Sequence, residues 1–316
     1  MSDDSSVELP FPHRRSPHQA QAARHHAEWL HRHRELAAST GQLSYERWDV
    51  PELAALTYPE SSAEDLGLAA DLMGFYFLFD DQFDDALGRR PEEVAEICER
   101  LTALMHSPRP VGSTPAERAF SDLWRRSIEG MSPRWRARAA YNWESYFASH
   151  PAEAAGRIAS RPPDRESYLM LRRGTAAMET IFDMIERLGR FEVPQAVLHH
   201  PVLRQLRQLA ADIPSLTNDV RSYAQELARG DVANLVMIVQ RERDCSPEEA
   251  ASVVMAEAQL MADKVGELMN ELPEVYRLLR LTVADRHAAH RYADGLGAWT
   301  AGYLRWELRT GRYVSG

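Results

Sequence analysis

The chain has 316 residues, of which 44% are hydrophobic, so it is long and apolar enough to form a globular protein with a sizeable core. Its formal net charge is −10 and no long basic run is present, which argues against nucleic acid as the main partner. The sequence starts with polar and acidic residues rather than a signal peptide, and its longest apolar stretch, residues 66–79, is too short to span a membrane.

Apolar residues recur at helical spacing along the whole chain, and no strand-like alternation with hairpin turns is found. We therefore predict an all-α fold, a single domain of residues 1–316 whose helices form a bundle around a central active-site cavity, with about residues 1–15 as a mobile N-terminal segment. Two isolated cysteines without metal-binding spacing predict free thiols and a cytoplasmic location. The predicted helices cover residues 18–37, 64–87, 91–106, 115–129, 133–149, 165–188, 200–229, 231–242, 247–270, 274–284 and 286–309.

An acidic cluster follows the apolar run that ends at Phe79, with four carboxylates at positions 80, 81, 84 and 85. A solvated helix end is the ordinary explanation of such a cluster, but unpaired carboxylates beside a buried face are costly. Asp80 and Asp84 are four residues apart and would project from one side of a helix, where their charges repel unless a cation lies between them. Carboxylate oxygens of this kind suit Mg²⁺, which is commonly shared with substrate phosphates.

A second polar motif occurs far along the chain, where Asn218, Ser222 and Glu226 are spaced at i, i+4 and i+8. On a helix they form one stripe of oxygen ligands, roughly 12 Å long. An amide, a hydroxyl and a carboxylate can together bind one hard cation and leave positions for a ligand's oxygens. Alone, the stripe is better explained as a polar helix face; together with the aspartate motif it predicts a metal site.

Taken together, these motifs resemble those of the class I terpene synthases. The segment Asp80 to Asp84 resembles their aspartate-rich motif, and the Asn218 stripe resembles their second metal motif. The final Arg312-Tyr313 resembles the C-terminal arginine–tyrosine pair of the microbial enzymes. The segment from Arg172 to Ala176 resembles the part of those enzymes that carries the diphosphate-sensing arginine. The resemblance extends over nearly the whole chain and is nearest to the pentalenene-synthase-like bacterial subgroup.

The resemblance implies Mg²⁺-dependent ionisation of an acyclic prenyl diphosphate, followed by cyclisation of the carbocation and release of diphosphate. Three Mg²⁺ ions are implied, held by Asp80, Asp84, Asn218, Ser222 and Glu226. Arg172, Arg312 and Tyr313 would bind the diphosphate, since arginine offers a planar fork of donors to phosphate oxygens. Asp81 points away from Asp80 on a helix and would form a lid salt bridge with Arg312.

Further residues are implied near the reacting carbon. Thr175 would link the sensing arginine to a helix break, and Ala176 would turn a backbone carbonyl toward the substrate. Tyr76, Phe77 and Trp306 are candidates for aromatic rings that stabilise the cation. One position departs from the family pattern, because Gln225 stands where bacterial relatives usually have a diphosphate-binding lysine.

Several alternatives remain open from the sequence. Farnesyl diphosphate is the expected substrate, and a diterpene synthase that uses geranylgeranyl diphosphate is the main alternative. A chain-elongating prenyl diphosphate synthase should have two aspartate-rich motifs, and a di-iron bundle should have paired Glu-x-x-His motifs, neither of which is present. A non-catalytic metal-binding scaffold should have degraded motifs, whereas all five ligands are intact. The sequence leaves open the product, its quenching by water or by deprotonation, and assembly as a homodimer.

Overall fold

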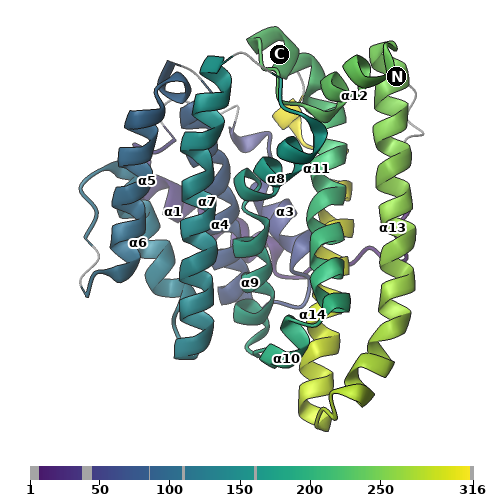
Figure 1. Ribbon diagram of the computed structural model, residues 1–316. Helices are drawn as coiled ribbons and strands as arrows, with labels where there is room; N and C mark the ends of the chain where they lie inside the picture. The colour runs from purple at the N-terminus through teal and green to yellow at the C-terminus, as the bar shows by residue number, and fades with distance from the viewer. Residues whose placement is uncertain (1–6, 38–44, 85, 109–110, 160–161, 314–316) are drawn as a thin grey trace.

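The computed structural model describes residues 7–37, 45–84, 86–108, 111–159 and 162–313. Within these residues all regular secondary structure is helical, so the all-α prediction is confirmed (Figure 1). Short 3-10 turns span Asp81–Phe83, Ala86–Arg89 and Gly311–Tyr313. The α-helices are, in chain order, α1 (Gln19–Arg32), α3 (Val50–Thr57), α4 (Ala63–Asp80), α5 (Pro91–His106), α6 (Pro115–Ser127), α7 (Pro133–Ala159), α8 (Arg165–Thr175), α9 (Met178–Gly189), α10 (Gln195–Leu198), α11 (Pro201–Arg229), α12 (Leu235–Arg243), α13 (Pro247–Leu278) and α14 (Val283–Glu307).

Most helices begin at a residue whose side chain caps the first turn. The Ser246 side chain caps α13 and Glu249 completes a capping box, while Thr114 and Glu117 do the same for α6. The predicted mobile segment is partly attached, because the backbone N–H of Glu8 donates to Gln259 of α13 at 2.8 Å. Residues 1–6 of that segment lie outside the described residues.

Three prolines lie inside helices, and two of them make a sequence prediction wrong. Helix α7 continues through Pro151 to Ala159, although the predicted helix ends at residue 149. Residues 247–278 form one helix that continues through Pro273, where the sequence analysis separates two helices. Proline normally interrupts a helix because it lacks the N–H group and displaces the carbonyl four residues earlier. In α11, Pro214 has no N–H group to donate to the carbonyl of Ala210. The Thr300 hydroxyl of α14 approaches this carbonyl oxygen at 3.4 Å instead. Contacts with neighbouring helices can thus sustain a helix across a proline.

Two further boundaries differ from the prediction. The predicted helix 64–87 ends as an α-helix at Asp80 and continues as a 3-10 turn, so the aspartate motif lies on a helix end. The predicted helix 165–188 is divided between Thr175 and Met178. Helix α3 was not predicted, because its residues 53–57 are all buried and leave no polar face whose period could be recognised.

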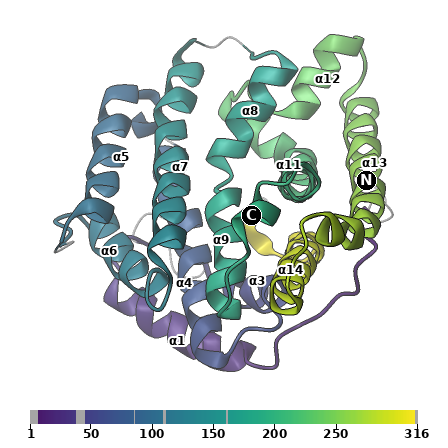
Figure 2. The ribbon, with the colours of Figure 1, turned by 60° about the horizontal axis from the view of Figure 1, so that its bottom comes forward.

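The helices surround a central cavity. Figure 2 looks along the bundle and shows α4, α7, α9, α11 and α14 around the middle of the molecule, with α5, α6 and α13 farther out. One apolar cluster connects Ala22 of α1 with Trp306 of α14, so the outer and inner helices share a core. None of the described helices is both long and apolar enough to cross a membrane. The motif-bearing ends of α4 and α11 therefore stand on a packed frame.

A close helix contact generates the first prediction. A Cβ at Gly302 of α14 would lie 2.4 Å from the carbonyl oxygen of Leu56 in α3, and that backbone atom cannot move aside alone. Gly302→Ala should lower the free energy of unfolding by about 1–3 kcal/mol through overpacking. The matched control is Gly266→Ala in α13, where the new Cβ would meet Pro10 at 3.6 Å, an ordinary contact. That variant should be stabilised by about 0.5–1 kcal/mol, since alanine favours helix over glycine. Denaturant unfolding of both variants measures the difference, and equal stabilities would contradict the close packing of α3 and α14.

Candidate active site

The central cavity has a volume of about 380 Å³ and is lined by residues from α3, α4, α7, α8, α9, α11, α14 and the C-terminal turn, among others. This size suits a small-molecule ligand. Its lining combines carboxylates and arginines with an apolar wall that includes Met73, Leu53 and Ile181. A ligand with one anionic end and one hydrocarbon end would match both parts.

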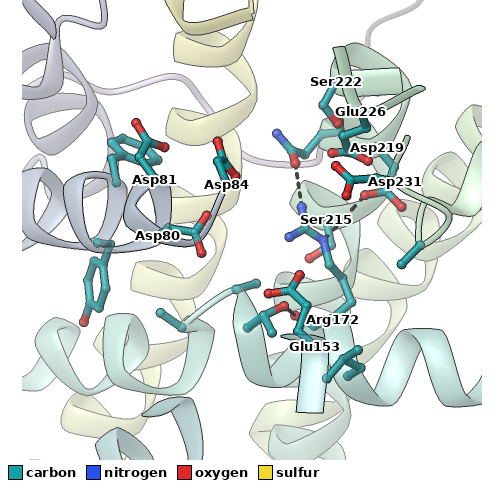
Figure 3. A pocket seen from close by; sticks show the side chains of 18 of the residues that line it. Asp80, Asp81, Asp84, Glu153, Arg172, Ser215, Asp219, Ser222, Glu226 and Asp231 are labelled. Carbon is teal, nitrogen blue, oxygen red and sulfur yellow. Dashed lines mark hydrogen bonds and ion pairs between the residues drawn. The ribbon is translucent and has the colours of Figure 1, made fainter. Parts of the chain in front are cut away.

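The aspartate motif reaches the cavity from the end of α4. Asp80 and Asp84 both line it, and Figure 3 shows them facing Ser222 and Glu226 of α11 across the open space. The Asp80 side chain is 49% exposed and lines the cavity. The structure thus brings together residues that are more than 130 positions apart in the sequence.

The charges of these aspartates are poorly compensated. Burial and the charge of Asp80 raise the pKa of Asp84 to about 7, although Arg229 contacts the Asp84 carboxylate at 2.9 Å. Burial and the charge of Glu153 raise the pKa of Asp80, although the His150 ring, 3.8 Å away, and the charge of Arg312 oppose this shift. Carboxylates held together in a low-dielectric cavity favour a proton or a bound cation.

The second motif forms the facing wall. The Asn218 side-chain oxygen accepts a hydrogen bond from Arg172 at 2.5 Å, and its amide nitrogen donates to the Tyr313 hydroxyl at 2.8 Å. The Ser222 hydroxyl donates to the Asn218 carbonyl at 2.8 Å, and Glu226 accepts from Asn234 at 2.9 Å. The predicted stripe therefore lines the cavity, and Asn218 connects it to two residues that were predicted to bind diphosphate, Arg172 and Tyr313.

Arg172 is held in place by Asp219, a residue for which the sequence predicts no role. Its Nε lies 3.5 Å from the Asp219 carboxylate, which also accepts from the Tyr168 hydroxyl at 2.5 Å and from the Leu235 backbone N–H at 2.8 Å. Asp219 thus joins α8, α11 and the start of α12. It directly follows Asn218 in the sequence, but only the tertiary contacts show that it positions the arginine.

The helix is interrupted between α8 and α9, at the place that the family resemblance implies. Thr175 ends α8, and Ala176 has φ −76° and ψ 0°, outside the helical pattern. Ala177 has a positive φ of 57°, a conformation that costs energy for a residue with a Cβ and is often found at functional sites. Thr175, Ala176 and Ala177 all line the cavity. The break therefore exposes irregular backbone to the ligand space.

The predicted aromatic residues differ in placement. Tyr76 lines the cavity, stacks on Trp143 at 5.1 Å between ring centroids and shares a hydrogen bond of 2.7 Å with Thr180. Phe77 also lines the cavity and stacks on Trp306 at 5.5 Å. Trp306 is fully buried behind Phe77 and is not among the cavity-lining residues, so the sequence expectation that it faces the cation needs correction. Trp306 shares a helix face with Trp299 and Tyr303, but Phe77 stacks on its ring and its indole N–H is bound to the Trp48 carbonyl, so these two residues cover it.

Two other residues of α14 take the place predicted for Trp306. Trp299 and Tyr303 line the cavity and stack on each other at 5.4 Å. Trp48, which precedes α3, lines it as well. These rings carry no motif, but Trp299 and Tyr303 precede Trp306 by seven and three residues, so the helix face predicted to carry Trp306 also carries them.

The C-terminal pair, Arg312 and Tyr313, also lines the cavity. Arg312 contacts Asp81 through both nitrogens of its fork, at 2.6 and 3.3 Å, and Tyr313 contacts Asn218. The structure therefore contains the salt bridge expected between Asp81 and Arg312. Arg157, Glu153, Asp231 and Arg229 also line the cavity without having been predicted, because they come from isolated positions with no recognisable spacing.

The donor set fits hard metal ions. All five predicted ligands offer oxygen atoms, and the carboxylates among them have raised pKa values because burial and neighbouring acids disfavour their charge. No group of three or more His, Cys, Asp or Glu side chains in the described residues is already arranged as a metal site. A cation shared with a ligand's oxygens fits this arrangement better than a site made by protein alone.

Comparison with known proteins is consistent with this geometry. Residues 71–261 match the family model described as terpene synthase family 2, C-terminal metal binding. The crystal structure of germacradien-4-ol synthase from Streptomyces citricolor is 67% identical in sequence, covers 98% of this chain and 100% of its own, and superimposes with a TM-score of 0.92. Pentalenene synthase from Streptomyces arenae is 36% identical over 99% of this chain and 94% of its own length. A (−)-β-caryophyllene synthase from Saccharothrix espanaensis, named as farnesyl diphosphate cyclizing, is 36% identical over 98% of this chain and 88% of its own length.

The raised pKa of Asp84 generates a prediction about pH. In the folded state this pKa is about 7, above the value near 3.9 of an unfolded chain, so the folded protein holds the proton more tightly. The metal-free protein should therefore lose stability as pH rises from about 4 to about 7. Asp84→Asn should raise the free energy of unfolding by about 1–2 kcal/mol at pH 8 and much less at pH 5.

Unfolding of the metal-free protein at both pH values measures this effect. Glu271→Gln, which changes an exposed carboxylate on α13, serves as the control and should show no such pH difference. Addition of Mg²⁺ should stabilise the wild type more than Asp84→Asn. The account of the aspartates would be wrong if the two variants responded alike to pH and to Mg²⁺.

Proposed function

This chain belongs to the bacterial class I terpene synthases, and we propose that it ionises farnesyl diphosphate and cyclises the carbocation to a sesquiterpene. The observation that supports this most directly is the meeting of the Asp80 and Asn218 motifs across one cavity that also has an apolar wall. The similarity to germacradien-4-ol synthase and to a farnesyl diphosphate-cyclizing enzyme supports the choice of a fifteen-carbon substrate.

The five oxygen ligands of the two motifs would hold Mg²⁺, and the family resemblance suggests three ions. Bound Mg²⁺ would supply positive charge beside the diphosphate oxygens on which negative charge develops. Arg172 and Arg312 would donate hydrogen bonds to the same diphosphate, with Tyr313 as a further donor. When the carbon–oxygen bond breaks, the electron pair leaves with the diphosphate, and these donors would stabilise the product without reorganising.

The chain's other residues would act on the hydrocarbon. Ala176 would offer a carbonyl at the helix break, joined through Thr175 to the arginine that senses diphosphate. Tyr76 and Phe77 would present ring faces to the cation, where cation–π attraction contributes about 0.5–2 kcal/mol. Trp299 and Tyr303 are added to this set because they line the cavity. The apolar wall would protect the cation from uncontrolled reaction with water.

We propose that the product is an alcohol, because germacradien-4-ol, named for the 67% identical enzyme, is one. Incubation with the C10, C15 and C20 diphosphates and Mg²⁺, followed by mass spectrometry, should give most product from the C15 substrate. In water enriched in oxygen-18 the product mass should rise by about two units, since water would supply the hydroxyl. A preference for the C20 substrate would support the diterpene alternative, and an unlabelled hydrocarbon would show that the cation is quenched by deprotonation.

The role of the aspartate motif has its own test. Asp80→Ala should reduce turnover by more than tenfold, a loss of at least about 1.4 kcal/mol in transition-state stabilisation. Circular dichroism should show an unchanged helical fold, because the Asp80 side chain faces the cavity rather than the core. Asp263→Ala on the exposed surface of α13 is the matched control and should keep full turnover. Residual activity of Asp80→Ala above a tenth of the wild type would sink the assignment of Asp80 as a metal ligand.

A further inference from the structure

The C-terminal turn that carries Arg312 rests on a short segment near the other end of the chain, residues 45–48. The Trp48 carbonyl accepts hydrogen bonds from the Trp306 indole at 2.6 Å and from the Thr310 hydroxyl at 3.1 Å. The next carbonyl back, that of Arg47, accepts from the Gly311 backbone N–H at 2.9 Å. The course of the chain just before Arg312 is therefore set by backbone atoms of this segment.

The same segment holds the Arg312 side chain. The guanidinium carbon lies 4.4 Å from the centre of the Trp48 ring and 4.5 Å from that of Phe77, two rings that meet edge to face. Its nitrogens point to Asp81, and both Trp48 and Arg312 line the cavity. Two aromatic faces thus orient the fork whose donors would meet the diphosphate, and they attract its positive charge.

A buried series of contacts through Tyr45, His26 and Asp71 fixes the position of Trp48. The Trp48 ring packs against Tyr45 at 4.9 Å, and the Tyr45 hydroxyl bonds to His26 of α1 at 2.8 Å. The other nitrogen of His26 bonds to Asp71 of α4 at 2.9 Å. Gly74 makes this approach possible, because a Cβ there would lie 2.4 Å from the Tyr45 hydroxyl oxygen.

Asp71 anchors the chain of contacts on the helix that also carries the aspartate motif. It is fully buried, and besides His26 it contacts His25 at 2.9 Å and Arg126 of α6 at 2.9 Å. Removing one partner from such a buried group is costly, so Asp71 keeps a defined position. Tyr45 and Trp48 are therefore placed relative to α4, and through α4 relative to Asp81.

We propose that Trp48 is a positioning residue for diphosphate binding and that Tyr45 acts through it. Trp48 holds the Arg312 side chain in the orientation in which its guanidinium group pairs with Asp81 and would donate hydrogen bonds to the diphosphate at the same time. Tyr45, tied to Asp71 through His26, keeps the Trp48 ring and carbonyl in place. This inference rests on the proposed function, in which Arg312 contacts the diphosphate.

The test measures the binding of inorganic diphosphate in the presence of Mg²⁺ by calorimetry, without any turnover. Trp48→Leu should raise the dissociation constant about tenfold, because the ring face under Arg312 and its attraction are lost. Trp48→Phe should recover most of the affinity, since a smaller ring face remains. Tyr45→Phe removes only the hydroxyl and should raise the dissociation constant about threefold. Because the buried His26 ring then lacks that partner, the melting temperature should fall by a few degrees, and binding is measured well below it.

Hydrogen exchange gives a second readout. With Mg²⁺ and diphosphate bound, residues 306–313 should be protected in the wild type and in Trp48→Phe, and less protected in Trp48→Leu. The matched control is Trp124→Leu, which removes a buried tryptophan of α6 that does not line the cavity, and it should change stability without changing diphosphate affinity.

Arg312→Gln separates failure of this inference from failure of the proposed function. If Arg312→Gln leaves diphosphate affinity unchanged, the proposed contact of Arg312 with diphosphate is wrong. If Arg312→Gln weakens binding but a folded Trp48→Leu binds as the wild type does, the positioning role of Trp48 is overturned. Should Trp48→Leu not fold, Tyr45→Phe decides, and wild-type affinity and protection in that variant would overturn the proposal.

Discussion

The electrostatic constraint on this protein is the gathering of carboxylates around one cavity. Asp80 comes from the end of α4, Asp84 from just after the 3-10 turn that follows it, and Glu226 from α11, and burial raises the pKa of each of them. Protein cations compensate only part of this charge, because Arg229 reaches Asp84 while Arg172 is occupied by Asn218 and Asp219. A frame of packed helices keeps these groups together at a cost that bound cations would remove.

The rest of the site follows from this constraint. Metal ions that neutralise the carboxylates would need further oxygen ligands, and an anionic substrate would supply them. The arginines would then have a second use, since Arg172 and Arg312 line the cavity while paired with Asp219 and Asp81 and would donate to that substrate from these positions. Ionisation would leave a cation in the apolar part of the cavity, where the rings of Tyr76 and Phe77 lie.

Much of this site could be predicted from the sequence because its ligands lie at fixed helical spacing. Asn218, Ser222 and Glu226 share one face of α11 whatever the rest of the chain does, and the structure turns that face to the cavity. The Arg312–Asp81 contact was expected from the family resemblance and is present. The interruption of the helix after Thr175 was also predicted from the family resemblance, because local helix propensity favours one continuous helix there.

Other features depend on contacts that no local pattern encodes. Trp306 was placed in the cavity by its distance from Arg312, but its burial is decided by packing against Phe77 and Trp48. Residues such as Glu153 and Trp48 reach the site from isolated positions, so no spacing identifies them. Proline rules also failed at Pro151 and Pro273, because they describe an isolated helix whereas α7 and α13 are supported by their neighbours.

The central claim is that the two motifs bind one shared cluster of ions together with diphosphate. Electron paramagnetic resonance of Mn²⁺, a spectroscopic substitute for Mg²⁺, tests it directly, because free Mn²⁺ gives a sharp signal that weakens on binding. The wild type should remove free Mn²⁺ strongly only when diphosphate is present, and both Asp80→Asn and Glu226→Gln should largely abolish that effect. Equal Mn²⁺ binding with and without diphosphate, or full binding in either variant, would contradict a shared cluster.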